Sequence, residues 1–279
     1  MSTAIRQRRS TLFVGALALG ELPAALASGA DIVCIDLEDA VPPGRKDEAR
    51  AAVVAMLKNV AAPRGVQIIA RVNSLRSLAG IEDASALLRE PRIGGLLLPK
   101  VDSADEVRWA AALADDAGRE TELYAIIETA DGLEHCRAIA AAHVRLKALF
   151  FGAFDLSTAL GCANEWEPLL YARSRAVHAA AAANIEVLDS PFPGVDDLEG
   201  LRAACAQVKA LGMSGKAAKH AKQIATIREA FTPTRAEIER ARSIVAKFRD
   251  DPTQPLVHEG KLVELPVIKR LERLAALEP

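Results

Sequence analysis

Short runs of Val, Ile, Leu and Phe recur along the chain, separated by longer Ala-rich segments of helical period. Runs that lack an apolar–polar alternation are typical of parallel strands covered on both faces. They predict eight strands, at residues 11–15, 32–37, 67–72, 94–99, 123–128, 148–152, 186–189 and, less regularly, 207–213.

The segments between these runs predict seven helices, at residues 21–28, 46–58, 81–89, 104–117, 132–142, 166–183 and 198–206. Eight strand–helix units in about 220 residues match a (β/α)₈ TIM barrel, whereas a doubly wound open sheet more often has five or six strands. We therefore predict a TIM-barrel catalytic domain over residues 1–222, with the open sheet as the alternative.

The character of the chain changes after Met213, where helical segments are followed by a polar, proline-bearing segment at residues 249–254 and by residues 256–261. Thr234 and Glu237 are spaced as in a capping box. The C-terminal extension, residues 223–279, has too few apolar residues for a core of its own, so we expect it to pack on the barrel or on a neighbouring subunit. It predicts three helices, at residues 223–230, 235–248 and 266–277.

Composition excludes several classes of protein. The chain has 279 residues, with 35 Lys and Arg against 37 Asp and Glu spread along it, so we expect no nucleic-acid partner. Its longest apolar stretches are interrupted well before the roughly 20 residues that cross a bilayer, so we expect no membrane span. The cysteines lack the spacing of a zinc site and predict reduced thiols in a cytoplasmic protein: Cys34, Cys136, Cys162 and Cys205.

Charged side chains follow five of the predicted strands. The carboxyl ends of barrel strands face the active site, so polar groups at these positions carry functional weight. Any single one could equally be a solvated loop residue or a helix cap. The series is Asp36, Glu38 and Asp39 after the second run, Arg71 at the third, Lys100 after the fourth, Glu128 at the fifth and Asp155 after the sixth.

So many carboxylates at one barrel mouth would repel each other unless a cation balances them. Two carboxylates from separate strands, with water in the other positions, are what Mg²⁺ commonly accepts. We assign Glu128 and Asp155 as the Mg²⁺ ligands, because each directly follows an apolar run. The alternative is an ion pair of these carboxylates with Arg71 or Lys100 and no metal.

Several ordered motifs resemble those of the citrate lyase β-subunit-like (HpcH/HpaI aldolase) family. They are RRSTLFVGA, DIVCIDLEDAV followed by KDEAR, ARVNS, LLLPKV, IIETADGL and FFGAFDL, running from Arg9 to about Lys216. The resemblance implies a Mg²⁺-dependent TIM-barrel carbon–carbon lyase, usually a homotrimer or hexamer. Its substrates would be 3-hydroxyacyl-coenzyme A thioesters of the malyl-, citramalyl- or citryl-CoA type, cleaved to an acyl-CoA and a 2-oxo acid.

The resemblance also assigns roles to individual residues. It implies the same metal ligands as the charge argument, and it implies that Arg71 grips an oxygen of the 2-oxo acid. Glu38 would act on water beside the metal, next to Asp36 and Asp39. Arg9 would contact substrate or the coenzyme A phosphates, and Lys100 is either a substrate contact or a structural ion pair.

Three departures from the family pattern concern the substrate site. FVPG is here Phe13-Val14-Gly15-Ala16, and the GK…IHP motif reads Gly215-Lys216-Ala217-Ala218-Lys219-His220-Ala221. Glu264 stands two residues before Pro266, where family members place a catalytic Asp. Glu264 is thus either the acid for the thioester enolate or a solvated residue at a helix start, and His220 is either a second acid/base candidate or a capping residue.

Three other functions stay open at this point. The same site could hydrolyse malyl-CoA-like thioesters, or act as a class II aldolase on free 2-oxo acids. The chain could also be a non-catalytic subunit of a lyase complex. The ordered motifs favour the acyl-thioester branch.

Overall fold

The computed structural model describes residues 7–250, 256–258 and 261–276. The chain forms two compact units, one that ends at Phe231 and one that begins at Thr232. The sequence placed this boundary between residues 222 and 223. The helix α10 (Ile224–Phe231) lies with the barrel because it buries Ile224, Ile227 and Phe231 in the barrel's hydrophobic core.

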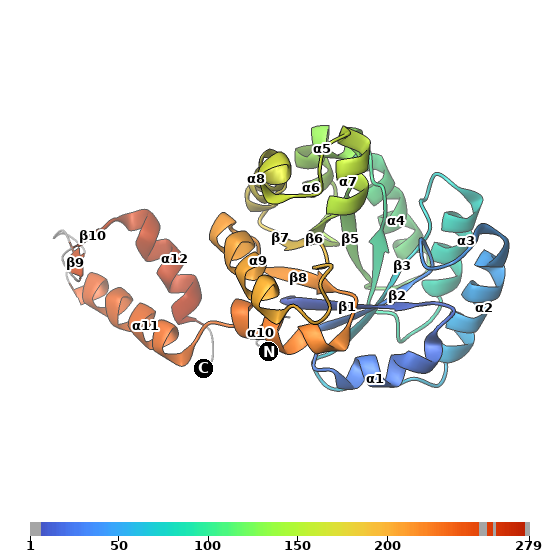
Figure 1. The fold of residues 1–279 in the computed structure, drawn as a ribbon, viewed down its shortest axis with the longest axis horizontal. Helices are drawn as coiled ribbons and strands as arrows, with labels where there is room; N and C mark the ends of the chain where they lie inside the picture. The colour runs from blue at the N-terminus through green and yellow to red at the C-terminus, as the bar shows by residue number, and fades with distance from the viewer. Residues whose placement is uncertain (1–6, 251–255, 259–260, 277–279) are drawn as a thin grey trace. The chain divides into compact units, whose positions relative to one another are not determined.

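The first unit is a closed barrel of eight parallel strands in sequence order, in which β1 pairs with both β2 and β8. The predicted TIM barrel is therefore confirmed. Figure 1 shows the strands at the centre of this unit with the helices arranged around them. The strands are β1 (Ser10–Gly15), β2 (Ile32–Asp36), β3 (Gln67–Arg71), β4 (Gly95–Leu98), β5 (Glu122–Ile127), β6 (Leu146–Phe151), β7 (Glu186–Asp189) and β8 (Gly215–Ala218).

Seven predicted strands lie where the sequence placed them, and the eighth prediction, residues 207–213, is wrong. That segment forms the end of a helix and the turn after it, and β8 follows at Gly215–Ala218. The apolar pattern does not reveal β8, because this strand consists of Gly, Lys and two Ala rather than β-branched residues. Lys216 is tolerated there since its ammonium contacts the buried Asp189.

The helices around the barrel match the Ala-rich segments. An additional short helix, α7, follows β6 directly and was not predicted. The helices are α1 (Leu22–Ala27), α2 (Lys46–Leu57), α3 (Leu78–Leu87), α4 (Ala104–Asp116), α5 (Ala130–Glu134), α6 (Cys136–Ala140), α7 (Ala153–Leu160), α8 (Trp166–Ala183), α9 (Leu198–Leu211) and α10, with single turns of 3₁₀ helix at Leu19–Glu21, Pro43–Arg45 and Ala221–Gln223.

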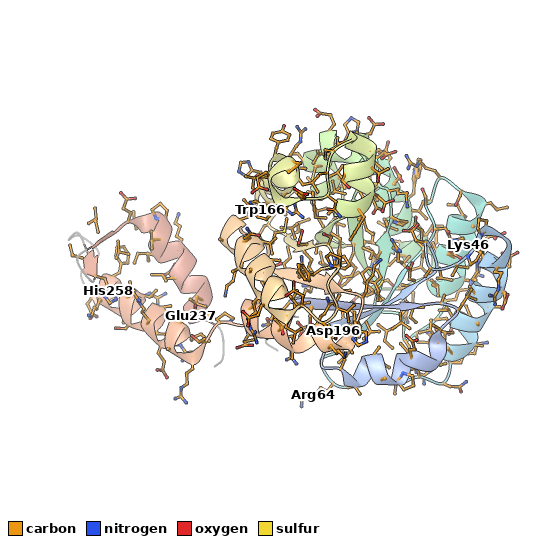
Figure 2. All side chains as sticks on the ribbon, in the orientation of Figure 1. Lys46, Arg64, Trp166, Asp196, Glu237 and His258 are labelled. Carbon is orange, nitrogen blue, oxygen red and sulfur yellow. The ribbon has the colours of Figure 1, made fainter. Side chains whose placement is uncertain are left out.

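Side chains pack on both faces of the barrel strands (Figure 2). One hydrophobic cluster lies between the strands and the helices, and a second, which includes Ile69, Leu97 and Tyr124, fills the barrel interior. Cys34 belongs to the interior cluster, and all four cysteines are free thiols. Because side chains fill the interior of the barrel, its open hollows lie at its two ends.

The second unit contains α11 (Arg235–Asp250), the antiparallel pair β9 (Leu256–His258) and β10 (Lys261–Val263), and α12 (Leu265–Ala275). The predicted capping box is confirmed: the Glu237 backbone N–H donates to Thr234 Oγ1 over 3.1 Å, and the Thr234 N–H donates to Glu237 Oε2 over 2.6 Å. The last predicted helix is α12, and residue 277, its expected end, lies outside the described residues. In the part of the chain that the structure describes, no helix is long and apolar enough to span a bilayer.

Candidate active site

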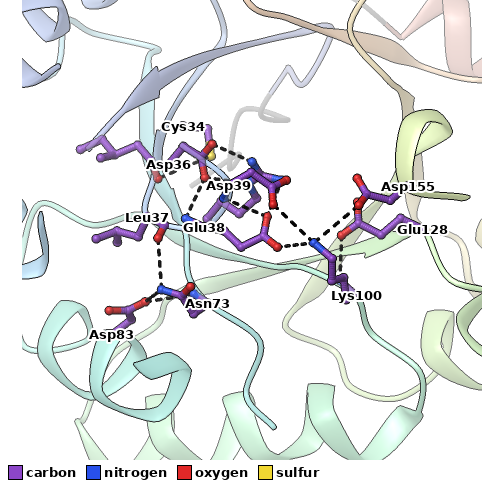
Figure 3. Close-up of polar contacts among 12 residues, drawn as sticks. Cys34, Asp36, Leu37, Glu38, Asp39, Asn73, Asp83, Lys100, Glu128 and Asp155 are labelled. Atoms are coloured by element: carbon purple, nitrogen blue, oxygen red, sulfur yellow. Dashed lines mark hydrogen bonds and ion pairs between the residues drawn. The ribbon is translucent and has the colours of Figure 1, made fainter. Parts of the chain in front are cut away.

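The charged residues predicted at the barrel mouth lie together at the carboxyl ends of β2 to β6 (Figure 3). Parallel strands bring these ends to one edge, so residues far apart in sequence become neighbours. The structure thereby brings together all seven residues of the predicted series: Asp36, Glu38, Asp39, Arg71, Lys100, Glu128 and Asp155.

Arg71 is the centre of an ion-pair network. Its Nε and Nη2 donate to the two oxygens of Asp36 over 2.8 and 2.6 Å, and its Nη1 lies 2.8 Å from Glu38 Oε2 and 3.2 Å from Asp39 Oδ2. Its guanidinium carbon also lies 5.5 Å from the centroid of the Phe13 ring. Burial acts to lower the pKa of Arg71, but the carboxylates around it raise that pKa above its usual range, so the side chain is a permanent cation.

Lys100 connects two groups of carboxylates. Its ammonium contacts Glu38 and lies 3.7 Å from Asp155 Oδ1. Burial acts to lower the pKa of Lys100, but the contact with Glu38 and the charge of Glu128 raise it. The backbone of Lys100 has φ of +50°, in the left-handed region, and its N–H donates to Glu128 Oε1 over 2.9 Å. This uncommon conformation lets one residue contact Glu128 through its backbone and Glu38 through its side chain.

Glu128 lies beside Asp155 and is the most deeply buried carboxylate of this cluster, with 3% of its surface exposed. Burial raises the pKa of Glu128 to about 7; the charge of Lys100 acts to lower it and the charge of Asp155 adds to the rise. Gly152 makes this arrangement possible, since a Cβ at that position would lie 2.6 Å from Glu128 Oε2 and even closer to Glu128 Cβ. The glycine that precedes α7 thus allows the strand end carrying Glu128 and the turn carrying Asp155 to approach each other.

Glu38 and Asp39 are neighbours with opposite pKa shifts. Burial raises the pKa of the Glu38 carboxyl, although the charge of Arg71 opposes the rise. Burial acts to raise the pKa of Asp39 too, but the contact with Glu38 and the charges of Arg71 and Lys100 hold it below its usual value. Glu38 is therefore the more easily protonated of the two.

Two residues that were assigned no role from the sequence support the loop after β2. Lys46, labelled in Figure 2, donates to the backbone oxygens of Leu37 and Glu38 over 2.9 and 2.7 Å. Asn73 donates to the Leu37 oxygen over 3.1 Å and to the buried Asp83 over 2.6 Å. Both lie in quoted motifs, KDEAR and ARVNS, so the signal was present, but spacing alone did not reveal a supporting role.

A cavity of about 560 Å³ lies at this mouth and is lined by Arg71, Glu128 and Asp155. Its volume is typical of a site for a small molecule. Lys219 and Phe154 also line it, and the Lys219 ammonium lies 5.6 Å from the centroid of the Phe154 ring. Both residues lie in motifs quoted from the sequence but were given no role there, because Phe154 lies in an unpredicted helix and Lys219 follows the strand that was predicted in the wrong place.

Arg9 does not join this cluster. It precedes β1, at the opposite end of the barrel, where its Nη2 lies 2.7 Å from Asp31 Oδ1 and its backbone N–H donates to Asp31 Oδ2 over 2.9 Å. Arg9 therefore does not lie at the mouth, where the substrate contact implied by the resemblance would require it. A larger hollow, of about 1640 Å³, lies at that opposite end and has Arg9 and Asp31 in its lining.

The other two candidates, His220 and Glu264, are exposed. His220 caps the 3₁₀ turn after β8 by accepting a hydrogen bond from the Lys222 backbone N–H. This contact favours the capping interpretation over the acid/base one. Glu264 belongs to the second unit, where it is the N-cap residue of α12 and makes no side-chain capping hydrogen bond.

The donor set at the mouth fits Mg²⁺. The candidate ligands are the two carboxylates Glu128 and Asp155, which interact electrostatically and line the same cavity; within the described residues, no group of three or more His, Cys, Asp or Glu side chains is arranged for a metal. These hard oxygen donors are the kind that Mg²⁺ binds while keeping several waters. The cost of burying Glu128 beside Asp155 falls when a cation is bound between them.

Comparison with known proteins decides the family. The model of the HpcH/HpaI aldolase/citrate lyase family matches residues 9–221. The chain belongs to this family. It is 32% identical to an L-malyl-CoA/beta-methylmalyl-CoA lyase of Rhodobacter capsulatus over 88% of this chain and 86% of the relative, and the predicted family is therefore confirmed.

Two further similar proteins are named for coenzyme A thioesters or bind coenzyme A. A (3S)-malyl-CoA thioesterase of Cereibacter sphaeroides is 32% identical and covers 97% of this chain and 94% of that protein. The solved structure of CitE from Mycobacterium tuberculosis in complex with magnesium, acetoacetate and coenzyme A is 27% identical, with a TM-score of 0.80 over 97% of this chain and 99% of that one. The family and its lyases identify this family member as a carbon–carbon lyase.

Proposed function

We propose that the protein is a Mg²⁺-dependent lyase that cleaves a 3-hydroxyacyl-CoA of the malyl-, citramalyl- or citryl-CoA type into an acyl-CoA and a 2-oxo acid. The observation that carries this proposal is the pair formed by Glu128, directly after β5, and Asp155, in the first turn of α7 after β6. The pair lies within a mouth that holds more carboxylates than cations. The CitE complex with magnesium and coenzyme A, and the malyl-CoA lyase, support the choice of cofactor and substrate class.

Glu128 and Asp155 would hold the cation. When bound, Mg²⁺ polarises the oxygens of the hydroxy acid and lowers the pKa of its hydroxyl group. Glu128 is fixed by the Lys100 backbone N–H and by the close approach of Gly152, so its carboxylate has little freedom to turn away. This rigidity positions the substrate oxygens before the bond breaks.

Arg71 would stabilise the negative charge that develops on the 2-oxo acid as the carbon–carbon bond breaks. Asp36 holds its guanidinium through two hydrogen bonds, and the Phe13 ring lies against it. Lys100 adds a second fixed positive charge beside Glu38 and Asp155. Both cations stay charged at neutral pH despite their burial, because the surrounding carboxylates keep the pKa of each above its usual value.

Glu264 is the proposed acid for the carbon of the thioester enolate. Its exposed carboxylate is not engaged in capping α12. We propose a homotrimer or hexamer in which the second unit of one subunit serves the barrel mouth of another. Mixing inactive Glu128→Gln subunits with inactive Glu264→Gln subunits restores part of the activity if this holds, and restores none if each chain serves itself.

The second candidate is a thioesterase, favoured by the similarity to the malyl-CoA thioesterase. Both candidates use the same site, and only the products separate them. The purified protein is incubated with Mg²⁺ and malyl-, citramalyl-, methylmalyl- or citryl-CoA, and the products are followed by mass spectrometry and a free-thiol assay.

A shorter acyl-CoA with a 2-oxo acid, lost in Glu128→Gln and with EDTA, confirms the lyase. Free coenzyme A with the intact hydroxy acid identifies the thioesterase instead. No turnover of any thioester contradicts both candidates.

A further inference from the structure

Lys219 is a cation at the barrel mouth that the proposed mechanism does not use. It follows β8 directly, its side chain is exposed, and it lines the same cavity as Arg71, Glu128 and Asp155. Its ammonium lies 5.6 Å from the ring of Phe154, the residue next to Asp155. Attraction of the ammonium to the ring face restricts this flexible side chain and keeps it near the candidate metal site.

The other two cations at the mouth are already engaged by carboxylates. Both Nε and Nη2 of Arg71 donate to Asp36, and its Nη1 is within 3.2 Å of Glu38 and Asp39. Lys100 contacts Glu38 and lies near Asp155. By contrast, Lys219 has no carboxylate within ion-pair distance among the described residues, and its contact there is the aromatic ring. An anionic group that enters the cavity therefore finds one cation whose charge is not already matched.

Apart from Arg71 and Lys219, the charged residues that line the cavity are carboxylates. Four carboxylates line it besides Glu128, namely Glu21, Asp36, Asp39 and Asp155. Mg²⁺ between Glu128 and Asp155 would attract one carboxylate of a substrate, but a second one would face this acidic wall. Lys219 is placed to compensate a second negative charge.

We propose that Lys219 binds a second carboxylate of the substrate, so that the 2-oxo acid released is a dicarboxylate. This inference rests on the proposed function and names the substrate class of that site. The anionic group could instead be a phosphate of coenzyme A, but the cavity that Lys219 lines is the small one that contains the metal pair. Lys219 therefore reaches the part of the substrate next to the reacting carbons, and it determines specificity between dicarboxylic and monocarboxylic 2-oxo acids.

The test measures binding without turnover. Dissociation constants of freshly prepared oxaloacetate, a dicarboxylate, and of pyruvate, a monocarboxylate, are determined by titration calorimetry with Mg²⁺ present. The wild-type protein binds oxaloacetate at least about tenfold more tightly than pyruvate. In Lys219→Met the preference falls to within about threefold with pyruvate affinity unchanged, whereas Lys219→Arg, which keeps the charge, retains it.

Lys222→Met is the matched control, because Lys222 is an exposed lysine nearby that is paired with Asp196 at 2.8 Å. This variant keeps the oxaloacetate preference. Pyruvate affinity serves as the test of correct folding for every variant. A separate titration with free coenzyme A shows whether Lys219 serves the phosphates.

Three results overturn the proposal: equal affinities for the two acids in the wild type, an unchanged preference in Lys219→Met, or a loss confined to coenzyme A binding. The binding measurement is independent of the reaction catalysed. If the products are those of a thioesterase but the preference depends on Lys219, the proposed lyase function fails and this inference stands.

Discussion

The two ends of the barrel are both charged, but they differ in how the charges balance. At the amino-terminal end Arg8 lies 2.9 Å from Glu122 and 2.8 Å from Glu186, and Arg9 lies 2.7 Å from Asp31. Arg228 lies 4.0 Å from that same Asp31. Among the described residues of this network, three arginines thus face three carboxylates. At the carboxyl end Arg71, Lys100 and Lys219 share the mouth with five carboxylates: Asp36, Glu38, Asp39, Glu128 and Asp155.

This difference distinguishes an end of the barrel that stabilises the fold from an end that is suited to binding. A balanced network of buried ion pairs fixes the positions of strands and needs nothing from outside. A surplus of carboxylates costs free energy unless a cation binds, and the protein retains that cost at the end where barrel enzymes bind their substrates. Part of this cost shows in the pKa of Glu128, which burial raises to about 7 and to which the charge of Asp155 adds.

The largest effect is expected when the same substitution is made at both ends. Glu128→Gln removes a proposed metal ligand and lowers kcat/KM by about 1000-fold or more with little loss of stability. Glu122→Gln removes a charge from the balanced network, so it lowers the free energy of unfolding by about 1–2 kcal/mol and leaves kcat/KM within about threefold. Steady-state kinetics and thermal unfolding of both variants check this; equal losses of activity would erase the distinction between the two ends.

Gly152→Ala is expected to have the next largest effect. The added Cβ would overlap Glu128, so the carboxylate or the start of α7 must move. We expect about a 100-fold loss of kcat/KM and a loss of about 1–3 kcal/mol of stability. Gly44→Ala is the control, because a Cβ there meets no atom within 4 Å. Full activity of Gly152→Ala at saturating Mg²⁺ would show that the close approach does not matter.

The effect of pH on Mg²⁺ binding is expected to be smaller. Because the pKa of Glu128 is about 7, protons compete with the metal below that pH, and the apparent dissociation constant rises toward about tenfold per pH unit. A raised carboxyl pKa contributes stability that is fully present below the unfolded value of about 4.3 and is lost as the pH rises through 7. Without metal, Glu128→Gln therefore gains stability relative to the wild type across this interval.

Thermal unfolding between pH 5 and 8, with and without Mg²⁺, measures both effects. The stabilisation by Mg²⁺ increases with pH in the wild type. A stabilisation that is the same at every pH would show that Glu128 is not the titrating ligand.

The smallest effect is expected for Arg9→Ala. Its partner Asp31 lies at the amino-terminal end, so the variant loses some stability but keeps kcat/KM within about twofold. Kinetics with a coenzyme A thioester at several concentrations check this. A tenfold rise in KM without a change in Tm would instead support the substrate contact that the family resemblance implied.

Much of the fold and part of the site could be predicted from the sequence for one physical reason. Strands covered on both faces must be continuously apolar, so charged residues such as Arg71 and Glu128 mark where each strand ends. The rule fails for β8, where small residues and the paired Lys216 replace the apolar run. It therefore also missed Lys219, which follows β8 at the same edge.

Direction along a strand explains the other discrepancy. Arg9 precedes the first apolar run, and the parallel order of the strands puts every such residue at the amino-terminal end. The family resemblance implied a substrate contact for Arg9, and this geometry does not support that contact. The supporting contacts of Lys46 and Asn73 were beyond prediction, because they join loops whose positions depend on the whole fold.

Calorimetric titration of Mg²⁺ into the wild type, Glu128→Gln and Glu122→Gln tests the central claim most directly. The account predicts one Mg²⁺ per chain in the wild type and in Glu122→Gln, and at least about a 30-fold loss of affinity in Glu128→Gln. Equal Mg²⁺ affinity in all three proteins would contradict the claim that the carboxylate surplus at the barrel mouth is a metal site.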